Sequence, residues 1–269
     1  YSSAASDVYK RQRLDLPQVT LIAVTSINLE ATLEAINACL RHVRFAACKL
    51  LTHKEPARTF PGLDVIITPK IGSADQYSRF ILTELANHVE TSHCLVVQWD
   101  GHVLSCDRWS PLFLDYDYIG ASWPHFTDGH DVGNGGFSLR SRRLLDACRS
   151  PQFALSHPED VAIGRHNRTW LEAQGLRFAP REIADTFSAE RASALDTAFG
   201  FHGVWHMPQS IGADRFWDIY CGLEDRSSVY HDQSAIMREL AGQPQGLRRC
   251  LRMGWDRLWK APRLKIGLP

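Results

Sequence analysis

An acidic residue directly follows the most apolar stretch of the chain. Residues 94–99 read CLVVQW and are followed by Asp100 and Gly101. The run predicts a buried strand, and ligands of open α/β sheets bind beyond the carboxyl ends of such strands. Asp100 is therefore placed to hold Mg²⁺ or Mn²⁺, which take one or two carboxylates and complete their coordination with substrate phosphates and water. The simpler alternative is a strand-ending turn, because Gly101 allows a tight one.

A glycine-rich segment lies further along, where residues 132–137 read VGNGGF. Asn134, Gly135 and Gly136 leave a surface with few side chains, so that a ligand can approach the backbone and its N–H groups closely. An Asn-Gly turn of a β-hairpin explains the same residues, and both interpretations can hold together. The pattern is neither a dinucleotide fingerprint nor a P-loop.

Two neighbouring carboxylates occur in the segment Ser156–Val161, which reads SHPEDV. Ser156 and Glu159 match a capping box at a helix N-terminus. That interpretation leaves Asp160 to point elsewhere, and a carboxylate within hydrogen-bond reach of a sugar hydroxyl can act as a general base.

A late histidine, His202, lies in the run FGFHG (199–203), with Trp205 close behind. A histidine among small and aromatic residues is more often structural, but beside Asp100 it would complete a divalent-cation site with a diphosphate. Trp205 can stack on a sugar ring, although such residues more often belong to a core. The sequence contains no HExxH, GxSxG or CxxC motif.

The elements that position these residues follow from hydrophobic periodicity. Strands are predicted at 19–24, 48–52, 63–68 and 94–99, and amphipathic helices over 29–43 and from 74, with Ser73 as N-cap, to 89. Strands that alternate with helices imply a mainly parallel sheet. In the second half, short strands are expected at 116–119, 137–139 and 176–179, with helices near 142–148 and over 159–174, the latter closed by Gly175. We therefore expect an α/β fold whose second half is irregular and builds the site.

Composition excludes several classes of protein. The 269 residues hold 30 Lys+Arg against 30 Asp+Glu, so the chain is neither a globally basic nucleic-acid binder nor a highly charged disordered protein. Seven cysteines without a CxxC pair argue against a disulfide framework. The net charge of zero hides two segments of opposite charge. Residues 246–269 hold seven Arg or Lys and one Asp, a net charge of +6, whereas residues 13–245 are acidic.

Five motifs in one order resemble a bacterial family of uncharacterised GT-A-fold glycosyltransferases. They are QWDG (98–101), YDYIGASWP (116–124), VGNGGFSLRS (132–141), PEDV (158–161) and FGFHG (199–203). Their layout is similar to that of Fringe and the β-1,3-galactosyltransferases. The resemblance implies a single GT-A-like domain over 13–245, with a mainly parallel central sheet flanked by helices and an acceptor-side second half.

The resemblance also implies roles for individual residues. Asp100 takes the place of the last Asp of the DxD motif, and Gln98 stands where its first Asp would be. Mn²⁺ or Mg²⁺ would be held by Asp100 and His202, and a neutral Gln98 adds no charge to that site. Asp160 matches the catalytic base of an EDV motif that also contains Glu159. The residues implied at the nucleotide-sugar donor are Thr25, Ser26, Gln98, Asp100, Asn134, Gly135 and Gly136, and those at the acceptor are Trp123 and Trp205.

The implied function is transfer of a sugar from a nucleotide-diphosphate sugar, with a UDP-sugar favoured, to a hydroxyl of a glycan or other acceptor, with inversion. Two alternatives stay open. One is a nucleotidyltransferase or other nucleotide-sugar enzyme, and the other is a non-catalytic relative that binds nucleotide sugars or carbohydrate.

Both ends of the chain differ from its body. Residues 246–269 place Leu247, Cys250, Leu251 and Leu258 at helical spacing among arginines, which fits an amphipathic helix at a membrane surface or one packed on the domain. A cytoplasmic protein that contacts the inner face of the membrane is the expectation. Residues 1–12 resemble the in-frame translation of a transposon-end sequencing adapter and are expected to be disordered. On that interpretation the natural start lies upstream, and a signal or anchor there stays open.

Overall fold

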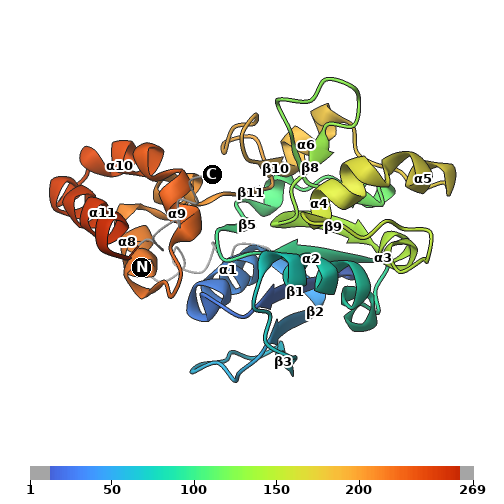
Figure 1. The fold of residues 1–269 in the computed structure, drawn as a ribbon, viewed down its shortest axis with the longest axis horizontal. Helices are drawn as coiled ribbons and strands as arrows, with labels where there is room; N and C mark the ends of the chain where they lie inside the picture. Colours follow the sequence, from blue (N-terminus) through green and yellow to red (C-terminus); the bar gives the residue numbers. More distant parts are fainter. Residues whose placement is uncertain (1–12, 261–269) are drawn as a thin grey trace, which may run out of the picture. The chain divides into compact units, whose positions relative to one another are not determined.

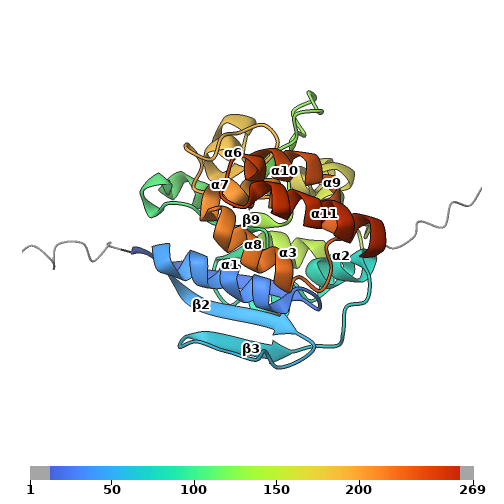
Figure 2. The same cartoon turned by 90° about the vertical axis from the view of Figure 1, so that its left-hand side faces the viewer.

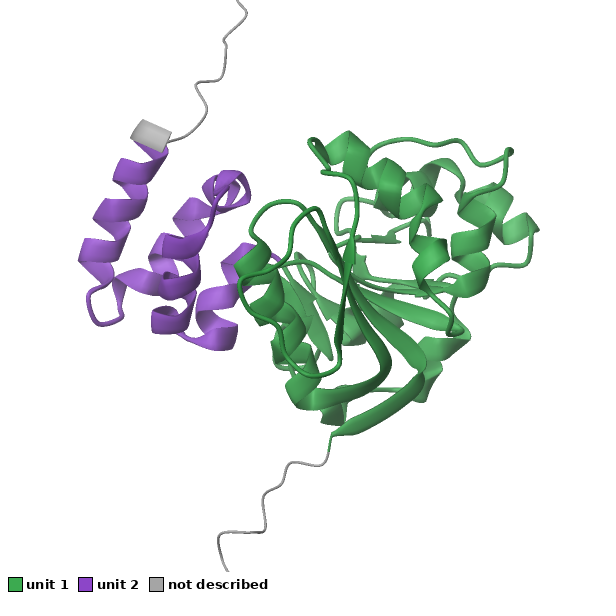
Figure 3. Ribbon diagram, turned by 90° about the horizontal axis from the view of Figure 1, so that it is seen from below, with its two compact units in different colours: residues 1–202 green, residues 203–269 purple. Residues whose placement is uncertain are grey.

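The computed structural model describes residues 13–260 of the chain, and the side chains of residues 13–258. The predicted adapter segment, residues 1–12, lies outside the described residues, as do residues 261–269 of the basic tail. The chain divides into two compact units, residues 1–202 and 203–269, which Figure 3 shows in different colours. This boundary falls inside the domain 13–245 that the resemblance implies.

A six-stranded sheet with the order β3-β2-β1-β4-β9-β6 forms the centre of unit 1 (Figure 1). The first four strands are parallel, whereas β9 pairs antiparallel with both β4 and β6. The predicted α/β fold with a mainly parallel sheet flanked by helices is confirmed. The strands of this sheet are β1 (Leu14–Thr25), β2 (Val43–Thr52), β3 (Leu63–Ile67), β4 (His93–Val97), β6 (Tyr118–Ile119) and β9 (Phe137–Ser141).

Alternating side chains of the parallel strands fill a core on each face of the sheet. Leu21 and Ala23 of β1 pack with α1 (Leu29–His42), which lies along β2 in Figure 2. Ile22 and Val24 point to the other face, toward α2 (Ala74–Thr83) and α3 (Arg142–Cys148). Burial on both faces explains why β1 and β4 read as continuous apolar runs.

The order of the strands reverses between β1 and β4. From β1 the chain moves outward through β2 to β3, and β4 then returns to pair with the other edge of β1. Such a switch point opens a crevice beyond the carboxyl ends of the two strands. Thr25 ends β1 and Asp100 follows β4, so the fold brings these two predicted residues to one edge of the sheet.

Two small sheets complete unit 1 above this edge. One joins β5 (Gly101–Val103), β10 (Ser188–Ala189) and β11 (Gly200–His202), and the other joins β7 (Ala121–Ser122) and β8 (Val132–Gly133). Its remaining helices are α4 (Glu159–Val161), α5 (Arg168–Ala173) and α6 (Arg181–Phe187).

The prediction of one continuous helix over 159–174 is wrong. A π-helical turn over 162–166 follows α4, and Asn167, whose side chain bonds the backbone of Ala154 and Ala162, separates it from α5. The predicted closure at Gly175 is confirmed, since this residue has a φ of +79° and its N–H donates to the carbonyl of Glu172.

Four other local predictions are also wrong. The helix predicted over 29–43 stops at His42, and the strand predicted from 48 already begins at Val43. Residues 176–179 form a single bridge, between Phe178 and Tyr118, instead of a strand. The helix predicted to reach 89 ends at Thr83 and is followed by a 3₁₀ turn over 85–88, whereas Ser73 caps it as predicted by accepting a bond from the N–H of Gln76.

Unit 2 is helical in its described residues and has a core of its own. Phe216 and Tyr220 of α8, Ile236 and Leu240 of α10 and Met253 of α11 are buried in it. Its helices are α7 (Met207–Ile211), α8 (Ala213–Gly222), α9 (Ser227–His231), α10 (Gln233–Ala241) and α11 (Gly246–Lys260). None of the helices within residues 13–260 is long and apolar enough to cross a membrane.

Candidate active site

A cavity of about 180 Å³ lies in unit 1, beyond the end of β4. Eight of the nine residues that line it are predicted site residues, and Glu190 is the ninth. The lining residues are Gln98, Trp123, Asn134, Gly135, Gly136, Glu159, Asp160, Glu190 and His202. Typical clefts for larger ligands have volumes of roughly 300–1,000 Å³, so this one has room for about a single sugar ring.

Pairing between β5 and β11 brings Asp100 and His202 together. Gly101 pairs antiparallel with His202, and a Cβ at Gly101 would approach the carbonyl oxygen of Phe201 to 2.7 Å. The predicted turn after the strand is present, since the N–H of Gly101 donates to the carbonyl of Gln98 at 3.1 Å. Gly101 has no positive φ, so the close approach of the strands, and not the turn, requires glycine at this position. The Nε2 atom of His202 lies 3.5 Å from Oδ1 of Asp100.

The imidazole of His202 lies between two carboxylates. Its Nδ1 is 3.2 Å from Oε1 of Glu190, on the opposite side from Asp100. Burial by itself would lower the pKa of His202, but the nearby charges of Asp100 and Glu190 raise it to about 10. Gly136 lies against this ring, and a Cβ there would overlap Nε2.

These side chains fit a divalent cation. Oδ1 of Asp100 is buried and has no hydrogen-bond partner, and Nε2 of His202 faces it at a separation that two ligands of one metal ion can have. Glu190 can accept the other ring N–H, which is the usual way in which a metal-binding histidine is oriented. Within residues 13–260 no group of three metal-ligating side chains forms a closed site. Mg²⁺ and Mn²⁺ do not need one, because phosphates and water supply the rest.

Asp160 lies in the wall of the cavity, half-buried, at the start of α4. Its Oδ1 accepts the N–H of Val161 at 2.8 Å, and no Lys or Arg of the described residues forms an ion pair with it. Burial first, and then the negative charge of Glu159, raise the pKa of Asp160 to about 6. A carboxylate with this pKa is ionised at neutral pH and has a stronger affinity for a proton than an ordinary Asp.

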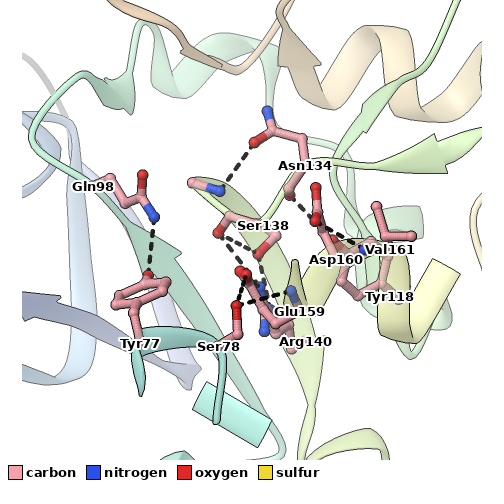
Figure 4. A network of polar contacts seen from close by, with 12 residues as sticks. Tyr77, Ser78, Gln98, Tyr118, Asn134, Ser138, Arg140, Glu159, Asp160 and Val161 are labelled. Carbon is pink, nitrogen blue, oxygen red and sulfur yellow. Dashed lines mark hydrogen bonds and ion pairs between the residues drawn. The ribbon is translucent and has the colours of Figure 1, made fainter. Parts of the chain in front are cut away.

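Glu159 is already engaged by its surroundings (Figure 4). Its Oε1 lies 3.3 Å from Nη2 of the fully buried Arg140, and its Oε2 accepts a bond from Ser78 Oγ, also at 3.3 Å. The backbone N–H of Glu159 donates to the same Ser78 oxygen. The capping box predicted for Ser156 and Glu159 is therefore wrong. Ser156 bonds the ring of His166 instead.

Asn134 begins the glycine segment with a left-handed backbone, at φ 66°. Its Oδ1 accepts the N–H of Gly136, while its buried Nδ2 has no partner and the residue lines the cavity. The Asn-Gly hairpin is wrong, because β8 pairs with β7 and β9 pairs with β4 and β6. The segment instead crosses between two sheets and presents an amide donor at the cavity.

The neighbouring Gly135 has a steric reason to be glycine. A Cβ at this position would overlap Oε1 of Glu159. On the opposite side of the cavity, Gln98 donates from its amide to the hydroxyl of Tyr77, as Figure 4 shows. Gln98 thus lines the cavity as a neutral, hydrogen-bonded side chain.

The remaining predicted residues lie in other places. Trp123 lines the cavity and packs against Gly133. Ser26 is buried, and its hydroxyl accepts the N–H of Ile71. The hydroxyl of Thr25 donates to the carbonyl of Ile27. Both residues lie at the edge of the sheet, and neither lines the cavity. Trp205 belongs to unit 2, next to His206, and its acceptor role stays a prediction.

Comparison with known proteins supplies a family. The family described as "Protein of unknown function (DUF5672)" matches residues 64–202, just over half of the chain. The chain belongs to this family. All nine residues that line the cavity lie within the DUF5672 segment, and its last residue is His202. Thr25 and Ser26 precede it and Trp205 follows it. No curated protein sequence matches the chain.

Three solved structures similar to this DUF5672 protein are glycosyltransferases. One is the mannosyltransferase PcManGT from Pyrobaculum calidifontis in complex with GDP-Man and Mn²⁺ (11% identity, 93% of this chain and 84% of that chain, TM-score 0.43). Another is a glycosyltransferase involved in glycosylation of the major capsid of PBCV-1 (13%, 76% and 98%, TM-score 0.45). The third is the apo form of GlyE from Streptococcus pneumoniae TIGR4 (13%, 75% and 51%, TM-score 0.41).

Two residues of the site, Arg140 and Glu190, are not among the predicted ones. Arg140 had a signal, since it interrupts the strand FSLRS with a charge on the same face as Ser138, to which its Nε donates. Glu190 had none. It follows β10, a strand of two residues, and only the pairing of β10 with β11 brings it to His202.

Proposed function

We propose that this protein is a glycosyltransferase that moves a sugar from a nucleotide-diphosphate sugar, a UDP-sugar being favoured, to an acceptor hydroxyl with inversion. One observation carries the proposal. Asp160, an ionisable carboxylate, and His202 both line a cavity that has room for about one sugar ring, and Asp100 lies beside His202. The two groups have opposite tasks in such a transfer, because one must accept a proton and the other must face a departing diphosphate.

Asp160 is the proposed general base. Its carboxylate has only the Val161 N–H as a hydrogen-bond donor among the described residues, so an acceptor hydroxyl can bind to it. Glu159, the other candidate carboxylate, is held by Arg140 and Ser78 and is proposed to position the backbone that carries Asp160. Asp160 would remove the proton as the hydroxyl oxygen attacks the anomeric carbon.

Asp100 and His202 are proposed to hold Mn²⁺ or Mg²⁺ against the diphosphate. The metal, when bound, would neutralise the charge that develops on the leaving group. Glu190 orients the ring of His202, and Gly136 leaves the space for it. Gln98 contributes a neutral side chain to this end of the cavity.

The nucleoside is proposed to bind along the carboxyl ends of β1 and β2. Thr25 pairs with Thr52 in the parallel register, and His53 follows. Oγ1 of Thr52 and Nδ1 of His53 are buried and have no hydrogen-bond partner in the described part of the chain. Such atoms are costly unless a ligand or water satisfies them. Asn134 Nδ2 and Trp123 are proposed contacts of the sugar and the acceptor.

The test is to incubate the purified protein and Mn²⁺ with UDP-, GDP- and CMP-sugars and to identify the released nucleotide. A nucleoside diphosphate, or the monophosphate from a CMP-sugar, is expected, together with a loss of about 10²–10⁴-fold in rate for Asp160→Asn. Asp64→Asn, at an exposed aspartate of β3, is the matched control and keeps full activity.

Other products of this assay have defined meanings. Pyrophosphate release would identify a nucleotidyltransferase, and binding of a donor without turnover would identify a non-catalytic relative. Full activity in excess EDTA would show that transfer needs no metal. A protonated His202 would then be the cation that faces the diphosphate.

A further inference from the structure

Helix α11 has an inward face that fixes its orientation in unit 2. Cys250 and Met253 are buried on this face. Asp256, which is 2% exposed, accepts bonds from the hydroxyl of Tyr220 on α8 and from Arg252, and Arg249 forms an ion pair with Asp214. These contacts determine which residues of α11 point away from its own unit.

The outward face carries an apolar stripe. Leu247, Leu251, Trp255 and Leu258 are 74%, 67%, 58% and 82% exposed, and their spacings of four, four and three residues place them on one side of the helix. They are four of the eight large exposed hydrophobic side chains among the described residues. Such a concentration marks an interaction surface, because single exposed apolar residues are normally scattered.

The charge around this stripe has one sign. Arg248 and Arg252 are exposed and each follows a stripe leucine by one residue, so they line the same edge of the stripe. Asp256, which is the single acidic residue of segment 246–269, points inward and is buried. The outward surface of α11 thus combines apolar side chains with cations and presents no carboxylate of its own.

We propose that the outward face of α11 binds an anionic membrane surface. A helix of fifteen residues is about 22 Å long and lies in the plane of the interface, with its leucines and tryptophan in the acyl boundary and its arginines at the headgroups. The inference needs only unit 2 and is independent of the proposed transferase activity.

A second copy of the chain fits this surface less well than lipid does. Pairing two stripes would bring cationic edges and two segments of net charge +6 together. Four side chains of one helix also offer less area than the roughly 800 Å² per partner of a stable interface. An anionic lipid surface instead satisfies the apolar stripe and the arginines at once.

The experiment is co-sedimentation of the full chain with vesicles of phosphatidylcholine, with and without phosphatidylglycerol. Binding is expected for the anionic vesicles only and should fall at least tenfold between low and high salt, because headgroup attraction is screened. The double variant Leu251→Glu, Trp255→Glu is expected to reduce partitioning about tenfold or more. The matched control is Ile67→Glu, Leu112→Glu, which changes two exposed apolar residues of unit 1 in the same way and keeps the binding.

Several results would overturn the proposal. These are no partitioning into anionic vesicles, equal partitioning of the two double variants, or equal binding to neutral and anionic vesicles. A dimer in light scattering that Leu251→Glu, Trp255→Glu dissolves, without any vesicle binding by the parent chain, would show that a second copy covers the stripe. Circular dichroism of each variant verifies that its helices are retained.

Discussion

At the scale of single residues, the cavity wall holds two adjacent carboxylates with different environments. Glu159 is compensated by Arg140 and Ser78, whereas Asp160 has no cationic partner among the described residues and is partly desolvated. Two carboxylates whose surroundings differ in this way are typical of an acid–base assignment, because one is held by its partners and the other can exchange a proton.

The pH dependence of transfer follows from Asp160. Because its pKa is raised to about 6, the proposed base would be protonated and inactive below that value. We expect kcat/KM to fall about tenfold per pH unit below pH 6 and to be level above it. A rate profile from pH 4.5 to 8.5 with saturating metal measures this, and a rate that stays constant down to pH 4.5 would exclude Asp160 as the base.

Asp160 should also lower the free energy of unfolding of the wild type at neutral and alkaline pH. A carboxylate with a raised pKa binds its proton more tightly in the folded state than in the unfolded state, so the wild type loses stability as pH rises from about 4 to above 6. Asp160→Asn removes this loss, and its free energy of unfolding should exceed that of the wild type at pH 8 by on the order of 1 kcal/mol, after allowance for solvent screening. Thermal denaturation at pH 8 and pH 4 measures it, with the two proteins equal at pH 4.

Glu190 should affect the metal without touching it. Glu190→Gln removes the carboxylate that orients His202, and loss of such a partner typically weakens metal affinity about 10–100-fold. Titration of Mn²⁺ by calorimetry or electron paramagnetic resonance gives the affinity, and His202→Ala should lose more of it. The same affinity for Glu190→Gln and the wild type would assign Glu190 a different role.

At the scale of elements, short strands bring the candidate ligands together. The pairing of β5 with β11 joins Asp100 to His202, and a side chain at Gly101 would collide with the backbone of Phe201. We expect Gly101→Ala to lower the free energy of unfolding by about 1–3 kcal/mol and to weaken Mn²⁺ binding. Gly222→Ala is the control, since a Cβ there meets nothing within 4 Å, and it should not lower the melting temperature.

The long elements were predictable from the sequence and the short ones were not. The periodicity of residues 29–42 and the apolar runs of β1 and β4 report burial that each segment undergoes by itself. Strands β5, β10 and β11 have two or three residues and exist through their pairing with distant segments. The break in the helix predicted over 159–174 likewise depends on the side chain of Asn167 and its bonds to Ala154.

The candidate site was predictable where chemistry and local sequence coincide. Asp100, Asp160, His202 and the glycine segment stand in short motifs, and all but Asp100 line the cavity, with Asp100 paired to His202. Glu190 was not predictable, because its role depends on a contact that only the folded chain creates. The contacts that hold the carboxylate of Glu159 could not be predicted either, because its partners Ser78 and Arg140 are far from it in the sequence.

At the scale of the whole molecule, the burial of cysteines provides a probe of the fold. All seven are free thiols, and burial raises the pKa of Cys39, Cys48, Cys94 and Cys148 to about 12. We expect the native protein to alkylate quickly at the exposed Cys221, more slowly at the half-buried Cys106, and at the remaining five only after unfolding. Mass spectrometry after timed iodoacetamide treatment measures this. Rapid labelling of Cys94 would contradict the buried position of β4.

The position of His202 has a practical consequence for dissecting the protein. The boundary between the two units and the end of the DUF5672 segment both fall directly after this residue. A fragment cut one residue early loses a candidate metal ligand, and one cut at the boundary gives that ligand a charged terminal carboxylate. Any separation of unit 1 should therefore retain Gly203 and several residues after it, and a spectroscopic label on the first or second of these residues would report on the candidate cation site.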